Sequence, residues 1–120
     1  MLKVHVERSG ETAVIECEGG IVRSDAAFKL RDAVNSQRDA RIIVLDLSEV
    51  SAIEGGGLGM LGFLQRWADE HEVRFKLFNP SESVRDRLER ANTMREFEVV
   101  TLDEMIVVLA RADRRYARAA

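Results

Sequence analysis

Residues 42–61 read IIVLDLSEVSAIEGGGLGML. The first six residues form an almost unbroken apolar run, which is typical of a central strand that is covered on both faces. We expect a loop through Ser51 to lead from this strand into the glycine cluster at 55–59. A helix should follow, with an apolar side formed by Leu58, Leu61, Leu64 and Ala68. This order of strand, glycine-rich turn and helix predicts an α/β unit.

The segment that precedes this stretch predicts two strands and a helix. Residues 2–7 and 12–18 alternate between apolar and polar types, and turn residues separate them at 8–11, so we expect a β-hairpin. Gly19-Gly20 should end the second strand. Ser24 and Asp25 are suited to cap a helix. The apolar side of that helix would consist of Ala27, Leu30, Ala33 and Val34.

The segment that follows predicts two more strands and two more helices. Residues 73–77 alternate as a strand, and a short strand is expected at 97–100. Residues 79–82, Asn-Pro-Ser-Glu, combine a cap, a proline at the first helical position and a glutamate that reaches back to the cap. Residues 101–104, Thr-Leu-Asp-Glu, form a second capping box. The last helix should present one apolar side made of Leu102, Met105, Ile106 and Leu109.

The predicted order is therefore β-β-α-β-α-β-α-β-α, which indicates the α/β class. Strands that alternate with helices form a largely parallel sheet with right-handed crossovers. We expect a small mixed sheet, mostly parallel with one antiparallel strand, packed by four helices. The length of 120 residues is close to the commonest domain size, so residues 1–120 are expected to form a single domain.

Composition argues against several classes of partner. The formal net charge is −3, with 18 basic and 21 acidic residues mixed along the chain, which gives no electrostatic footprint for nucleic acid or an anionic membrane. No segment approaches the ~18 apolar residues of a membrane span, and the N-terminus does not resemble a signal peptide. We therefore expect a cytoplasmic protein. The exception is the C-terminal cluster, interpreted as a solvated last helical turn: Arg111, Arg114, Arg115 and Arg118.

The glycine cluster also matches a nucleotide-binding pattern, but weakly. Residues 57–62 read GLGMLG, which fits the G-x-G-x-x-G signature of a dinucleotide site. However, the glycines begin ten residues after Leu47 rather than in a tight turn, and the next strand ends at Phe78-Asn79 without an acid for a ribose. No lysine follows the glycines, which excludes the phosphate loop of nucleotide hydrolases.

Few residues are candidates for catalysis or metal binding. The single cysteine, Cys17, lies on an apolar strand side, where a buried inert thiol is expected. His5 and His71 have no sequence neighbours that would complete a triad or a metal site. Asp46 ends the central strand, where α/β proteins often place functional groups. It could equally be a carboxylate that accepts hydrogen bonds from the following loop.

Together these residues resemble a known family, the STAS domain, named for sulfate transporters and anti-sigma factor antagonists. Family members carry a strand that ends in Asp/Asn-Leu, a short apolar loop and then Asp-Ser-Ser-Gly-Leu-Gly opening a helix. Here the matching residues are Asp46-Leu47, then Val50 and Ile53, then residues 54–59, Glu-Gly-Gly-Gly-Leu-Gly. Further matches cover nearly the whole chain, at residues 18–21, 78–84 and 90–93.

The departures from the family pattern bear on regulation. In the family, the first serine of Asp-Ser-Ser accepts phosphate from an anti-sigma factor that is also a kinase. The matching position is Gly55, which has no hydroxyl group. Glu54 replaces the preceding aspartate, and Gly56 replaces the second serine. Val22 occupies the position where the family has an acidic residue that closes the earlier turn. The resemblance therefore implies a binding surface without phosphorylation at this loop.

Three consecutive glycines have a conformational cost of up to about 1 kcal/mol each relative to alanine. Two interpretations remain open. In the first, the glycines only allow a sharp turn into the helix at Leu58. In the second, they strip its N-terminus of side chains so that a partner can approach closely.

The resemblance implies a non-enzymatic domain that docks on an anti-sigma factor or a related regulatory protein and needs no cofactor. The expected contact surface is the loop after the second strand, the glycine cluster and the start of the next helix. Its residues are Gly20, Ile21, Ser24, Asp25, Glu54, Gly55, Gly56, Gly57, Leu58 and Gly59. Two alternatives remain, a STAS subunit of a lipid-transport or signalling scaffold complex, and a module that binds a small ligand or nucleotide at the glycine-rich helix start.

Overall fold

The computed structural model describes the backbone of residues 1–119 and the side chains of residues 1–111. Its elements follow the predicted order, with a single 3₁₀ turn at Met94–Glu96. The strands are β1 (Lys3–Ser9), β2 (Thr12–Ile21), β3 (Ile42–Ile53), β4 (Arg74–Phe78) and β5 (Glu98–Val100). The helices are α1 (Ser24–Ser36), α2 (Gly56–Glu70), α3 (Glu82–Arg90) and α4 (Leu102–Ala119).

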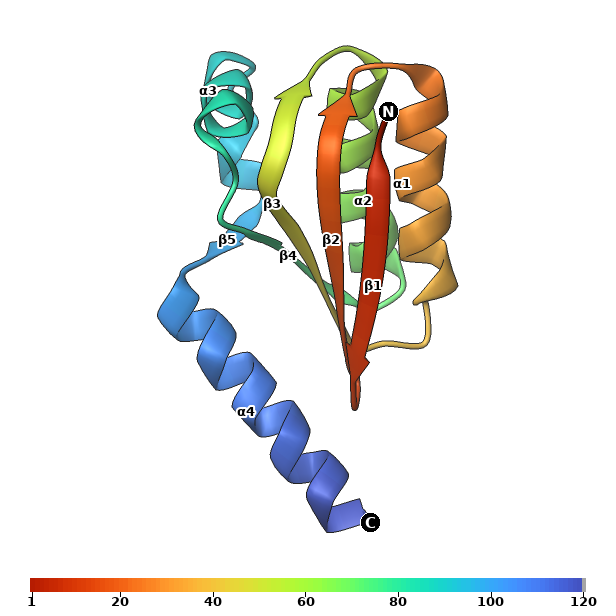
Figure 1. Ribbon diagram of the computed structural model, residues 1–120, viewed down its shortest axis with the longest axis vertical. Coiled ribbons are helices and arrows are strands. Elements are labelled where there is room, and N and C mark those ends of the chain that lie inside the picture. Colours follow the sequence, from red (N-terminus) through yellow and green to blue (C-terminus); the bar gives the residue numbers. More distant parts are fainter. Residues whose placement is uncertain (120) are drawn as a thin grey trace.

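The five strands form one sheet in the order β1-β2-β3-β4-β5. The strand β1 pairs antiparallel with β2, and the other neighbouring pairs are parallel. This confirms the predicted mixed sheet and its four helices. In Figure 1, α1 and α2 lie side by side behind the strands, and α4 extends from β5 past the lower end of the sheet.

The main core lies between the sheet and α1, α2 and α3. Alternate strand residues point into it, including Ile15, Leu45 and Leu77, all with 0% exposure. A smaller apolar cluster lies on the opposite sheet face, where Met105 of α4 packs with Val44 and Val100. No helix in the described part of the chain has the length and apolarity needed to cross a membrane.

The second and third strands are longer than predicted. Gly19-Gly20 does not end β2, and the expected loop through Ser51 belongs to β3. The two extensions pair with each other as Gly19 with Val50 and Ile21 with Ile53, after register shifts along β2. Gly19 continues the strand with a φ of 110°, which only glycine adopts readily. The paired extension carries β2 and β3 up to the glycine cluster.

Two of the three predicted helix caps were wrong in detail. The N-cap of α1 is Arg23, without a side-chain hydrogen bond, so Ser24 and Asp25 lie inside the first turn. The N-cap of α3 is Ser81, whose hydroxyl accepts from the Val84 amide, so the preceding proline stands outside the helix.

The capping box of α4 is confirmed, because the Glu104 amide donates to the Thr101 hydroxyl at 3.2 Å. The predicted apolar side of α4 is divided, since Met105 is buried whereas Leu102 and Ile106 are 62% and 55% exposed. The helix rests on the sheet through only part of its apolar surface.

Candidate partner-binding surface

The glycine cluster lies against the end of β2. The Glu54 amide donates to the Ile21 carbonyl oxygen at 3.3 Å. A Cβ added to Gly57 would overlap that same oxygen. Gly57 is buried, and its missing side chain is what allows α2 to begin so close to the strand. The fold therefore requires a glycine at position 57.

The fold requires glycine at position 55 for a different reason. It is the N-cap residue of α2 and adopts φ 49° and ψ −115°, a conformation that strains any residue with a Cβ. The Gly57 amide donates to the Glu54 carbonyl at 2.9 Å, which closes the turn around Gly55. The sharp entry into α2 therefore depends on Gly55 and Gly57.

Packing and backbone conformation do not require the remaining two glycines of the cluster. Gly56 and Gly59 are exposed, and a Cβ added to either would meet no atom within 4 Å. Both lie in the first turn of α2, where glycine is less favourable than alanine by about 1 kcal/mol. The fold does not require these two glycines, so the bare surface they leave is a candidate contact site.

The loop between β2 and α1 borders this surface. Ser24 and Asp25 are exposed, and so is Val22, at 46%. Gly20 approaches the β3 extension, since a Cβ there would lie 3.8 Å from the Ser51 hydroxyl. The loop after β2 and the glycine cluster thus adjoin, as the sequence predicted.

Three predicted contact residues lie wholly or partly beneath this surface. Ile21 has 0% exposure and Gly57 is buried, while Leu58 is half-buried and packs on the main core. These residues support the loop and the helix start. The bare patch, as we define it, consists of exposed residues only: Val22, Ser24, Asp25, Glu54, Gly55, Gly56 and Gly59.

Sequence reasoning missed one residue that positions the patch. Arg87 of α3 donates to the Glu54 carboxylate at 3.1 Å and ties α3 to the glycine cluster. The separation of 33 residues left no local signal for this pair. Val22 was noted as a departure from the family pattern, but its exposure could not be derived from the strand pattern.

The other candidates have structural roles. Cys17 is 2% exposed, and burial, together with the nearby Asp46 carboxylate, raises the pKa of its thiol to about 12. Asp46 accepts hydrogen bonds from the Ser48 amide at 3.0 Å and the Ser48 hydroxyl at 2.7 Å. His71 contacts the Trp67 carbonyl through Nδ1 at 2.7 Å and stacks on the Trp67 ring.

The hollows around α4 lie away from the glycine cluster. Among the described residues, no group of three His, Cys, Asp or Glu side chains is placed to hold a metal ion. Two hollows flank α4. Both lie between that helix and the sheet, with volumes of about 550 Å³ and 300 Å³, and neither is lined by residues 54–59.

Comparison with known proteins identifies the fold family. A family model described as the STAS domain matches residues 3–105. The chain therefore belongs to the STAS family.

Solved structures of similar fold include several anti-sigma factor antagonists. One from Mycobacterium paratuberculosis has a TM-score of 0.76 and 19% identity, over 92% of this chain and 95% of the other. Unphosphorylated SpoIIAA has a TM-score of 0.71 and 20% identity, over 87% and 93%. The phosphorylated form of SpoIIAA from Bacillus has a TM-score of 0.68 and 20% identity, over 89% and 99%. A comparison with curated protein sequences finds no match.

Proposed function

We propose that this chain is a cytoplasmic, non-enzymatic regulator that docks on an anti-sigma factor through the bare patch. One observation carries the proposal, namely that Gly56 and Gly59 are exposed in open space and are not required by the fold. A partner backbone can approach such a surface closely because no side chain intervenes. The similarity of fold to anti-sigma factor antagonists supports the choice of partner.

The electrostatics of the patch favour a backbone or an acidic group from the partner. The α2 N-terminus has no side-chain cap and no acidic residue in its first turn, so the positive end of the helix dipole favours an electronegative group there. Glu54 is held by Arg87 at the edge of the patch. The partner would therefore present carbonyl oxygens to α2 and its own side chains to Val22 and Asp25.

The test uses the purified anti-sigma kinases of the source organism and measures their affinity for the chain. Gly56→Arg fills open space, so the fold should persist while affinity falls at least about tenfold, or about 1.4 kcal/mol. Ser36→Arg is the matched control, since it adds the same side chain at the far end of α1. Wild-type affinity of Gly56→Arg would rule out the patch as the contact site.

We further propose that docking is not controlled by serine phosphorylation at this loop. Gly55 occupies the position of the family's acceptor, and glycine has no hydroxyl group to modify. Glu54 does not replace a phosphate, because it lies one residue earlier and carries about one charge rather than nearly two. Incubation with the kinases and ATP should leave residues 54–57 unmodified in a mass spectrum. Phosphate found in this segment would contradict the proposal.

Gly55→Ser tests whether the rest of the acceptor site survives. The positive φ of Gly55 means that this change should cost about 1–3 kcal/mol of stability. Gly55→Ala is therefore the control, since it carries the same strain without a hydroxyl. If kinase contacts are retained, only the serine variant should gain phosphate and lose affinity. A serine variant that binds but stays unmodified would indicate that Gly56 and Val22 also removed parts of the recognition site.

A further inference from the structure

The strand β1 lies at an edge of the sheet. In the described part of the chain the sheet order begins with β1, whose single neighbour is β2 (Figure 1). Among the described residues, no backbone hydrogen bond outside the β1–β2 ladder involves residues 3–8. An edge strand presents a row of N–H and C=O groups with which another strand can pair. The outer edge of β1 is therefore open to strand addition.

Most of the features that protect an edge strand from pairing are missing from β1. The strand has seven residues, and its sequence contains no proline. Its register with β2 runs without a shift from Lys3, opposite Glu18, to Ser9, opposite Thr12, so the strand has no bulge to turn its edge away. The helix α1 lies behind the strands (Figure 1) and covers a face of β1 rather than its edge. Only charged side chains remain as a barrier.

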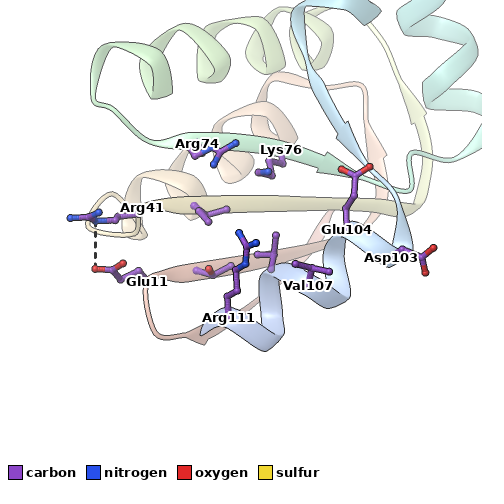
Figure 2. Close-up of a pocket in the computed structure, with 11 residues that line it drawn as sticks. Glu11, Arg41, Arg74, Lys76, Asp103, Glu104, Val107 and Arg111 are labelled. Atoms are coloured by element: carbon purple, nitrogen blue, oxygen red, sulfur yellow. Dashed lines mark ion pairs between the residues drawn. The ribbon is translucent and has the colours of Figure 1, made fainter. Parts of the chain in front are cut away.

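Ion pairs at the turn after β1 connect the hairpin to the rest of the sheet. Glu11, which lies in this turn, pairs with Arg41 at 3.5 Å (Figure 2), and Arg8 pairs with Asp39 at 3.1 Å. Both partners precede β3, so the hairpin is tied to the start of the central strand. A strand that is already ordered has less conformational entropy to lose when it binds. The edge of β1 is thus prepared for pairing in the single chain.

The sequence of this edge strand is complementary to itself in an antiparallel arrangement. Residues 3–7 read KVHVE. In a register centred on His5, each Lys3 lies opposite Glu7 of the other strand, and each Val4 lies opposite Val6. Opposite charges and β-branched residues that face each other stabilise antiparallel strands. A shift of two residues in either direction would lose both Lys3–Glu7 contacts, so the charges favour one register.

The side chains of residues 3–7 are available for such contacts. Lys3 and Glu7 are exposed. Within the described residues, Lys3 forms no ion pair, and the only ion-pair partner of Glu7 is His5 at 3.3 Å. Val4 and Val6 pack on the main core but stay partly exposed at the edge. A second strand beside β1 would pair the charges and bury the remaining valine surface.

We propose that two copies of this chain pair through β1, antiparallel and about a two-fold axis at His5. The two five-stranded sheets then form one continuous sheet. The contact is reciprocal, because each copy contributes the same residues. Backbone hydrogen bonds supply the affinity, and the side chains select the partner strand. The bare patch contains no residue of β1, so each dimer presents two such patches.

The mass of the full-length chain in solution, measured by sedimentation over a dilution series, tests whether the dimer forms. At the concentrated end of the series the mass should approach twice the 13.5 kDa of one chain, and it should fall toward one chain on dilution. A mass of 13.5 kDa at every concentration would overturn the proposal.

Charge-reversed variants test the contacts between the copies. Lys3→Glu and Glu7→Lys should each raise the dissociation constant at least about tenfold, because like charges then face each other twice. An equal mixture of the two variants should form a heterodimer, since the acidic strand of one pairs with the basic strand of the other. Glu7 lies opposite Val14 within the chain, so Glu7→Lys should keep its melting temperature, which separates lost pairing from lost folding.

Cysteine substitutions test the register. Antiparallel residues that face each other without hydrogen bonds have Cα atoms about 4.5 Å apart, which is within the range of a disulfide. His5→Cys should therefore oxidise to a covalent dimer. Lys3→Cys is the matched control, because its two copies would lie about 13 Å apart along the strands. The native Cys17 is buried and should not react. Equal cross-linking of the two variants would exclude an axis at His5.

Single charge variants that dimerise like the wild type, or a mixture that stays monomeric, would exclude this interface. If the wild-type chain is monomeric and β1 instead pairs with a strand of a different protein, the second copy is the wrong occupant. The bare patch is untouched by all of these substitutions. Anti-sigma factor binding should therefore persist in every variant, so failure of the dimer and failure of the proposed function give different results.

Discussion

Gly57 and Gly59 are two residues apart in one helical turn, yet they should respond oppositely to the same substitution. In Gly57→Ala the new Cβ would overlap the Ile21 carbonyl oxygen and lie 2.7 Å from Cγ2 of that side chain. We expect a loss of about 3 kcal/mol or more. Gly59→Ala enters open space and should stabilise the fold by about 0.5–1 kcal/mol. Urea unfolding of both variants measures the difference, and equal effects would contradict the assigned contacts.

The Cys17 thiol should be inert in the native state. Burial chiefly, and the Asp46 carboxylate, raise its pKa to about 12, so the reactive thiolate is scarce and access is blocked. A bulky disulfide reagent should label Cys17 only at the rate of unfolding. Native labelling as fast as that of a free cysteine would reopen a redox role.

The same pKa predicts how stability depends on pH. The folded thiol stays neutral up to about pH 12, while the unfolded thiol, with its ordinary pKa of 9.0, ionises above about pH 9. The contribution of Cys17 is therefore complete below pH 9 and is lost as pH rises toward 12. The stability gap between wild type and Cys17→Ala should shrink by about 1.4 kcal/mol for each pH unit above about 9. A constant gap would show that the thiol already ionises in the native state.

At the scale of elements, α3 depends on one hydroxyl group. Ser81 accepts from the Val84 amide at 3.3 Å and donates to the Val50 carbonyl at 2.6 Å, so it caps α3 and fixes it to β3. Ser81→Ala should cost about 1–2 kcal/mol. Ser83→Ala, at an exposed position inside the same helix, should change stability by less than about 0.5 kcal/mol. Thermal unfolding compares the two, and equal losses would contradict the cap.

Element type and order were predictable because periodicity depends on the sequence alone. The alternation at 12–18 and the apolar run at 42–47 identified β2 and β3. Their extensions to Ile21 and Ile53 were not predictable, because glycine and serine normally favour turns and here the pairing of the two strands overrides that preference. The start of α3 was assigned two residues too early, at Asn79 rather than Ser81, because Asn and Ser are both favourable N-cap residues.

At the scale of the whole molecule, the sequence located the candidate site but could not separate its structural residues from its exposed ones. A motif places residues 54–59 together. Only the contact of Gly57 with Ile21 distinguishes a structural glycine from Gly56, whose surroundings are open. The Glu54–Arg87 ion pair arises from packing between distant segments, and no sequence pattern in a single chain specifies it.

Amide hydrogen exchange, with and without a bound anti-sigma factor, tests the central claim most directly, because it needs no substitution and covers the whole chain. The account predicts slowed exchange on binding at residues 20–25 and 54–60, with the arginine-bearing end of α4 unchanged. Protection confined to α4, with residues 54–60 exchanging as in the free chain, would contradict docking through the bare patch.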